Sequence, residues 1–218
     1  KVCKGLMLAF GSGLVLSALP ALAQQATQLD RVEITGSSIK RLAAEQSLPV
    51  TVLKADDLAK AGVSSAEQAV NFIAANQSST GSTSSVGSSN GGAAFADLRG
   101  LGAERTLVLV NGKRMVNNPY LSAAVDLNAL PFGAVERIEV LTDGASAIYG
   151  TDAIAGVINF ITRKEYKGVG VSADGSWPTT SGGGQNYTAG ITAGAGSLSE
   201  QGWNVFGALN YRKQQPLQ

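Results

Sequence analysis

The sequence predicts an α/β (α+β) domain with a small mixed β-sheet and short helices, followed by antiparallel amphipathic strands. Up to about residue 165, β-prone segments alternate with short helical segments, which is typical of a small domain built on one sheet. After Lys164, apolar residues alternate with small or polar ones between glycine-rich loops, and this period of two indicates one-sided strands. An apolar leader at the N-terminus indicates that the chain is exported.

The leader occupies residues 1–23. Lys1 and Lys4 form a positive start, residues 5–19 are apolar and uncharged, and Ala21-Leu22-Ala23 is an A-x-A cleavage site before Gln24. The apolar run is shorter than the ~20 residues that a spanning helix needs. A signal peptide is therefore favoured over a transmembrane anchor.

The composition excludes several functional classes. Without the two leader lysines, the 17 Lys and Arg become 15 against 16 Asp and Glu, and these charges are dispersed, so no basic surface for nucleic acid is expected. The chain has no His, and its single cysteine, Cys3, lies in the leader, so zinc, haem and nucleophile–His catalysis lack their usual residues. Gly144-Ala145-Ser146-Ala147 begins like a nucleophile elbow, but Ile148 replaces the closing glycine. The sequence predicts neither an enzyme nor a cofactor or metal site.

The first half of the predicted domain contains a strand and two helices. Residues 49–53 predict the strand, and residues 55–61 predict a short helix with Asp56 and Asp57 at its positive end and Gly62 as its stop. The second helix starts at a capping box in residues 64–67. Its apolar stripe consists of Ala66, Ala69, Val70 and Ile73.

A loop and four further elements follow. Residues 76–92 are nearly all Ser, Thr, Gly and Asn and predict a mobile loop, and order returns at residues 95–99. Strands at 106–110 and 113–116 flank Asn111-Gly112, the strongest short hairpin signal. A loop at 117–120, a helical turn starting at Pro131 and a strand at 137–141 come next. A turn at Asp143-Gly144 and an apolar strand at 157–162 complete the domain.

Two strands are predicted beyond the domain. Tyr187, Ala189, Ile191 and Ala193 alternate with Thr and Gly residues, and Trp203, Val205 and Leu209 alternate with Asn204 and Asn210. One-sided apolar strands of this kind are a weak signature of a transmembrane barrel. A soluble sandwich shows the same pattern, so the residues alone leave both open.

Three stretches, in order and at consistent spacing, carry a family resemblance. They are residues 48–76; Leu98-Arg99-Gly100-Leu101-Gly102 with residues 105–114; and residues 126–162, which include Val135-Glu136-Arg137-Ile138-Glu139-Val140-Leu141 and Gly144-Ala145-Ser146-Ala147-Ile148-Tyr149-Gly150. Together they resemble the plug domain of TonB-dependent outer-membrane receptors. No single stretch would suffice.

The resemblance implies a barrel of about 22 strands filled by the plug. Such a receptor moves a scarce nutrient of the siderophore, cobalamin or carbohydrate class across the outer membrane of a Gram-negative bacterium. TonB and its inner-membrane partners supply the energy, and outer-membrane lipid surrounds the barrel. The expected organisation is a signal peptide (1–23), a periplasmic segment (24–46), the plug (47–165) and the start of the barrel (166–218). The last segment holds about three or four transmembrane strands at ~10 residues each, so this chain is expected to be a fragment that cannot transport by itself.

The expected TonB-contacting segment is residues 31–35, with Val32, Glu33, Ile34 and Thr35 as contact residues. It is β-prone, follows a polar tail and precedes Gly36-Ser37-Ser38. It also resembles the family's TonB box, and strand addition to TonB would bind it through main-chain hydrogen bonds. An edge strand of the plug is the alternative interpretation.

Two other sets of residues are candidates for contacts. Buried ion pairs between plug and barrel wall give register without strong net adhesion. The candidates for that seam are Arg99, Glu136, Arg137 and Glu139, and ordinary pairs within the plug sheet are the alternative. The candidates for the ligand-facing loops are Ser88, Asn90, Phe95, Asn117 and Tyr120, since aromatic and amide groups suit both sugars and metal chelates.

Two other functional classes compete with the transporter. An outer-membrane adhesin or structural barrel with an N-terminal domain would need no segment for energy coupling. A secreted carbohydrate-binding or hydrolytic enzyme is disfavoured by the missing catalytic residues.

Overall fold

The structure is a computed structural model that describes residues 50–81, 92–119, 124–142, 145–177, 179 and 184–215. The leader, the predicted turn at Asp143-Gly144 and the candidates Val32, Glu33, Ile34, Thr35, Ser88, Asn90 and Tyr120 lie outside these ranges. The elements are β1 (Val50–Lys54), α1 (Ala55–Lys60), α2 (Ala66–Asn71), η2 (Ala103–Arg105), β2 (Thr106–Val110), β3 (Lys113–Arg114), η3 (Leu127–Ala129), η4 (Phe132–Ala134), β4 (Val135–Leu141), α3 (Ser146–Tyr149), η5 (Thr151–Ala153), β5 (Gly156–Thr162), β6 (Gly168–Ser176), β7 (Asn186–Ser197) and β8 (Trp203–Gln214).

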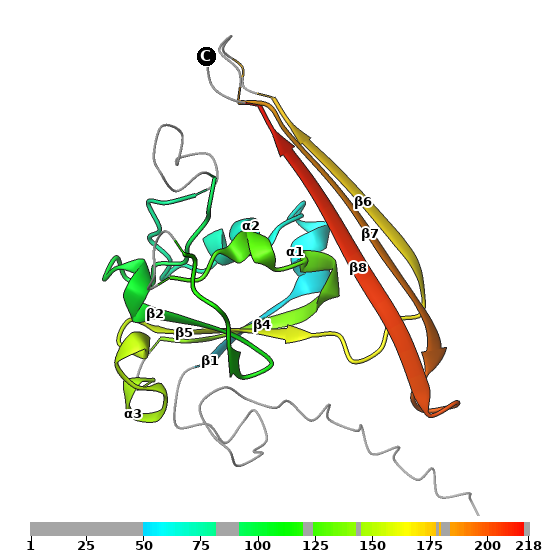
Figure 1. Cartoon of the computed structure of the whole chain (residues 1–218), viewed down its shortest axis with the longest axis horizontal. Coiled ribbons are helices and arrows are strands. Elements are labelled where there is room, and N and C mark those ends of the chain that lie inside the picture. The colour runs from blue at the N-terminus through cyan, green and yellow to red at the C-terminus, as the bar shows by residue number, and fades with distance from the viewer. Residues whose placement is uncertain are drawn as a thin grey trace, which may run out of the picture. The chain divides into compact units, whose positions relative to one another are not determined.

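The first sheet joins strands in the order β1-β4-β5-β2-β3 (Figure 1). β2 and β5 run parallel, and the other neighbours are antiparallel, so the sheet is mixed as predicted. The hairpin between β2 and β3 turns through Asn111 at φ 50° and Gly112 at φ 76°, the two positive values that a type I′ turn requires. The hairpin is confirmed, although β3 is only two residues long.

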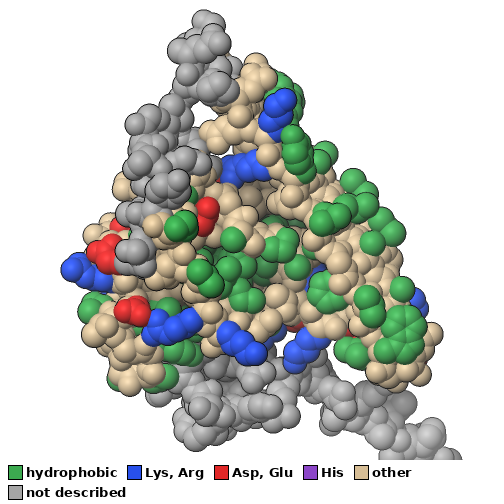
Figure 2. All heavy atoms as spheres, viewed as in Figure 1, with side chains coloured by type: hydrophobic (Ala, Val, Ile, Leu, Met, Phe, Trp, Pro, Cys, Tyr) green, Lys and Arg blue, Asp and Glu red, His purple; other side chains and the backbone are tan. Residues whose placement is uncertain are grey.

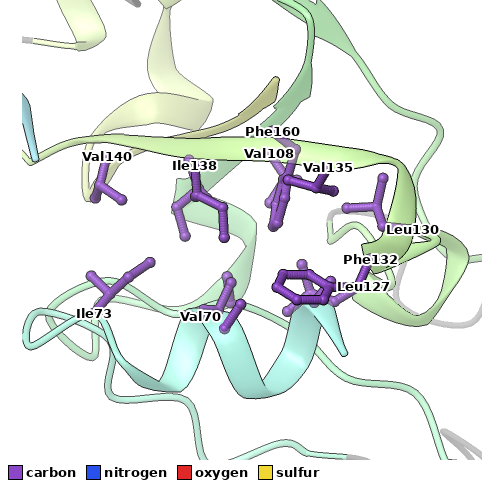
Figure 3. Packing of buried hydrophobic residues seen from close by; sticks show 14 of the residues in the cluster. Val70, Ile73, Val108, Leu127, Leu130, Phe132, Val135, Ile138, Val140 and Phe160 are labelled. Atoms are coloured by element: carbon purple, nitrogen blue, oxygen red, sulfur yellow. The ribbon is translucent and has the colours of Figure 1, made fainter. Parts of the chain in front are cut away.

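The larger core lies between this sheet and the helices α1 and α2. The predicted stripe of α2 is confirmed, because Ala66, Ala69, Val70 and Ile73 are all buried. In Figure 3, Val70 and Ile73 point toward Ile138 and Val140 of β4. Burying each such aliphatic side chain contributes about 1.5–3 kcal/mol, so these contacts hold the helix on the sheet.

A second, smaller core covers the opposite face of the sheet. It contains Leu107, Leu109, Leu141, Ala145, Ala153 and Val157. Figure 1 shows α3 on this side and α1 and α2 on the other. β2 and β5 are buried on both faces, which explains their nearly continuous apolar sequences. Within the described ranges, no helix is long and apolar enough to cross a membrane.

The start of α2 corrects the predicted capping box by one residue. Ser65 is the N-cap, and its hydroxyl accepts the backbone N–H of Gln68 at 3.2 Å. Gln68 Oε1 in turn accepts the N–H of Ser64 at 2.8 Å. Because Gln68 and not Glu67 reaches back to the residues before the helix, the Glu67 carboxylate is left to make contacts elsewhere.

The predicted loop at 76–92 is partly ordered. Asn76 forms an antiparallel bridge with Leu98, and the N–H of Gln77 donates to the carbonyl of Asp97 at 2.7 Å. These main-chain hydrogen bonds need no apolar side chains. A prediction based on the composition of the loop therefore does not detect them. Residues 82–91 lie outside the described ranges.

The second sheet is antiparallel with the order β6-β7-β8. β7 and β8 confirm the two predicted strands and pair in continuous register from Asn186↔Gln214 to Ser197↔Trp203. β6 was not predicted. Its glycines at 168, 170 and 175 lower the strand propensity of the segment, so the sequence does not indicate a strand. Antiparallel pairing with β7 stabilises it as one.

Candidate functional site

The β6–β8 sheet has its polar and apolar faces reversed relative to a water-soluble sheet. Val169, Val171 and Leu209 are 71%, 77% and 75% exposed, whereas Thr188 and Thr192 on the other face are 8% and 9% exposed. Figure 2 shows hydrophobic side chains gathered on the surface of this sheet. In a water-soluble antiparallel sheet, the apolar face would be the buried one.

The α/β domain contacts the polar face of the sheet closely at η4. A Cβ atom placed on Gly133 would lie 2.4 Å from Thr192 Oγ1 of β7 and 4.0 Å from Ala208 Cβ of β8. The first distance is too short for any real side chain. Glycine at position 133 therefore leaves room for the Thr192 hydroxyl in the position that it occupies here.

An ion pair makes a second contact between the domain and the sheet. Both terminal nitrogens of Arg212 on β8 lie 3.3 Å from Glu67 Oε2 at the start of α2. Arg212 Nη1 also donates to Asn128 Oδ1 at 2.7 Å. The two charged side chains are 24% and 13% exposed. A partly desolvated pair of this kind contributes more to register than to net adhesion.

The four predicted seam residues are not among the residues that make these two contacts. Glu136, Arg137 and Glu139 are all on β4, where Arg137 Nε donates to Glu139 Oε1 at 2.9 Å and Nη1 donates to Glu136 Oε1 at 3.1 Å. The Glu139 side chain is fully buried, and Arg137 is 15% exposed. Arg99 is exposed and has a positive φ of 62°. These pairs match the alternative interpretation of ion pairs within the sheet, and a seam role for the four residues stays a prediction.

Sequence reasoning missed Glu67, Gly133 and Arg212. Arg212 could have been found from the sequence. It lies an even number of residues from Asn204 in a predicted amphipathic strand, which places its charge on the polar face. Glu67 was assigned to the helix cap, and Gly133 looked like part of a short turn. Only the tertiary structure brings these three residues to one interface.

The described ligand-loop candidates have different environments. Phe95 is 3% exposed and packs with Ala93 and Ala124, and it also lines a cavity of about 260 Å³ with Ser78 and Thr80, so a ligand contact at Phe95 stays a prediction. Asn117 is exposed and lines a cavity of about 350 Å³ together with Arg114 and Asp152, which form an ion pair. Asn117 remains a candidate for ligand contact.

The described residues hold no metal-binding cluster. No three His, Cys, Asp or Glu side chains gather around a common point in these ranges. Of the stretch that begins like a nucleophile elbow, Ser146 and Ala147 lie in α3, and Ala145 is its buried N-cap residue.

Comparison with known families identifies the α/β domain. The model of the TonB-dependent receptor plug domain matches residues 43–157, more than half of the chain. The chain belongs to this family. The plug thus comprises the five-stranded sheet with its helices, and the expectation from the sequence motifs is confirmed.

Solved receptors contain the same arrangement of plug and antiparallel strands. The siderophore receptor PirA from Pseudomonas aeruginosa matches with a TM-score of 0.57 and 24% identity over 79% of this chain and 30% of that chain. A double mutant of the ferric enterobactin receptor PfeA from the same organism has a TM-score of 0.59 and 28% identity, over 77% and 25%. The unliganded ferric citrate transporter FecA has a TM-score of 0.58 and 26% identity, over 78% and 26%. The chain therefore spans between a quarter and a third of the length of these receptors.

Proposed function

We propose that this chain is the plug and the first barrel strands of an outer-membrane receptor that takes up a scarce nutrient by TonB-dependent transport. The reversed polarity of the β6–β8 sheet carries the proposal. Its apolar face suits lipid, and its polar face suits the lumen of a barrel. The plug packs on the polar face, at Gly133 and at Glu67, where a plug inside a barrel must lie.

Transport by such a receptor needs a complete barrel. Among the residues that the structure describes, the three strands leave two unpaired edges, and unpaired backbone groups are not tolerated in the hydrocarbon region. Further strands must therefore close the wall around the plug, and the three strands seen here cannot transport alone. We assign residues 47–165 to the plug and residues 166–218 to the barrel.

The periplasmic segment 24–46 is the proposed site of energy coupling. Val32, Glu33, Ile34 and Thr35 would add as a strand to the sheet of TonB, and main-chain hydrogen bonds would supply most of the affinity. The cargo belongs to the siderophore, cobalamin or carbohydrate class. The solved relatives PirA and PfeA are named as siderophore and ferric enterobactin receptors, which favours a metal chelate among these classes.

The test is Ile34→Pro in the complete receptor, with Ile34→Ala as the matched control. Proline removes a main-chain donor and blocks strand pairing, whereas alanine keeps both donor and acceptor. Radiolabelled ferric siderophores, cobalamin and oligosaccharides are offered to cells that lack their own receptors. We expect energised uptake of one class to be lost in Ile34→Pro and kept in Ile34→Ala, with surface binding and thermal stability unchanged in both.

Two results would contradict the proposal. A loss of thermal stability together with uptake would show that residue 34 belongs to a plug strand. Normal uptake in Ile34→Pro would reject both a TonB-contacting segment and a plug strand at this position.

A further inference from the structure

The junction between the plug and β6, residues 163–167, is held at the plug end by Arg163. The N–H of Arg163 donates to the carbonyl of Ala134 in η4 at 2.9 Å. Its Nη2 donates to Asp56 Oδ1 of α1 at 2.6 Å, and the guanidinium carbon lies 5.7 Å from the centre of the Tyr166 ring. The junction therefore leaves the plug in a defined direction.

Asn204 of β8 holds the other end of the junction. Its Oδ1 accepts the N–H of Tyr166 at 3.2 Å, and its Nδ2 donates to the carbonyl of the same residue at 3.0 Å. Nδ2 also lies 3.1 Å and 2.9 Å from the carbonyls of Ala195 and Gly196 on β7. One amide thus binds both backbone groups of Tyr166 and joins them to the neighbouring strand.

Two further features fit the junction to the β7–β8 hairpin. The carboxylate of Glu165 accepts the N–H of Leu198, the first residue after β7, at 3.1 Å. A Cβ atom on Gly194 would lie 2.3 Å from the carbonyl oxygen of Tyr166, and one on Gly170 would lie 2.5 Å from its hydroxyl. The space that Tyr166 occupies exists because both of these positions are glycine.

β8 therefore contacts the plug and its junction at evenly spaced positions. Asn204, Ala208 and Arg212 are four residues apart, so their side chains lie on the same face of the strand. At ~3.3 Å per residue, the three contacts extend over about 26 Å. They reach the junction, η4 and α2 respectively.

We propose that Asn204 is a positioning residue that clamps the plug–barrel junction onto the β7–β8 hairpin. The junction then moves with the barrel strands, and movements of the plug are confined to residues before Arg163. This inference rests on the proposed function, because it assigns β6–β8 to the barrel wall. Asparagine is suited to the clamp because its side chain carries both a donor and an acceptor, as a peptide group does.

The experiment measures distances between spin labels in the complete receptor. The native cysteines of the mature receptor are replaced by Ser, and labels are attached at Lys164→Cys and Glu200→Cys, in the junction and the β7–β8 turn. We expect one narrow peak in the distance distribution of the labelled receptor. In the Asn204→Leu variant, this single peak should be lost and the distribution should broaden. The matched control is Asn210→Leu, the same change at an exposed position on the same face of β8, and it should keep the narrow peak.

A second label pair separates loosening of the junction from loss of the sheet. Labels at Ser172 and Glu200 report on the β6–β8 sheet alone and should keep their distribution in Asn204→Leu. Should that pair broaden as well, Glu165→Ala carries the test, because Glu165 is exposed and lies outside the strands. It should broaden the Lys164–Glu200 distribution without affecting the Ser172–Glu200 pair.

Hydrogen exchange gives an independent measurement at the Tyr166 amide. Loss of an ordinary hydrogen bond should speed its exchange by about two- to twelvefold in Asn204→Leu. A Lys164–Glu200 distribution that stays narrow in both Asn204→Leu and Glu165→Ala would overturn the proposal, as would equal broadening in Asn210→Leu. These measurements do not depend on uptake. The proposal of a clamp at Asn204 can therefore be rejected while the proposal of TonB-dependent transport is kept, or kept while that proposal is rejected.

Discussion

The ion pair between Arg212 and Glu67 should hold α2 against the barrel strands, and a double-mutant cycle can measure this. The two single changes are Arg212→Met and Glu67→Gln. Methionine keeps much of the apolar stem of arginine, and glutamine keeps the shape of glutamate, so both remove charge with little loss of packing. The double variant completes the cycle.

The expected magnitude follows from the burial of the pair. Exposed ion pairs contribute about 0–1 kcal/mol, whereas removing one partner of a fully buried pair costs about 3–5 kcal/mol. With side chains 24% and 13% exposed, this pair lies between the two cases. We expect Arg212→Met to lower the free energy of local opening of α2 by about 2 kcal/mol, because the Glu67 carboxylate then loses its cation. Glu67→Gln should cost less, since Arg212 keeps Asn128.

Hydrogen exchange of the α2 amides in the complete receptor reports this local opening directly. A loss of about 2 kcal/mol corresponds to roughly 30-fold faster exchange across residues 69–73. The coupling energy from the cycle should be about 1 kcal/mol. Lys213→Met, at the neighbouring exposed cation on the opposite face of β8, is the control and should leave α2 unchanged.

Two results would refute this reasoning. Equal exchange in Arg212→Met and Lys213→Met would show that the pair does not stabilise α2. Single-variant effects that add to within about 0.3 kcal/mol would show that Arg212 acts through its other contacts and not through Glu67.

Three further predictions follow from the leader, the close contact and the helix cap. The leader should be cleaved between Ala23 and Gln24, and the intact mass of the exported protein will show whether residues 1–23 are retained. Gly133→Val should force the plug away from Thr192 and lower the stability of the plug by about 1–3 kcal/mol, so an unchanged melting temperature would argue against a tight contact at η4. Ser65→Ala should raise exchange of the first amides of α2 by the equivalent of about 1 kcal/mol, and no change would exclude Ser65 as the cap.

The sequence alone determined most of the plug, because local signals there agree with the tertiary environment. The apolar stripe of α2 has a helical period that only one buried face satisfies. Asn111-Gly112 adopts positive φ at low cost and so specifies the hairpin. The apolar runs of β2 and β5 fit the middle of a sheet that is covered on both faces.

Tertiary structure decided which polar residues meet at the interface. Asn204 and Tyr166 are 38 residues apart, and Arg212 and Glu67 are 145 apart, so no local pattern links them. Phe95 was expected near a ligand because it follows the Ser/Gly/Asn segment, and the structure packs its ring with Ala124 from another part of the chain. A side chain's type records which interactions it can make, whereas its partner depends on how separate segments pack, and that information is not present in any single segment.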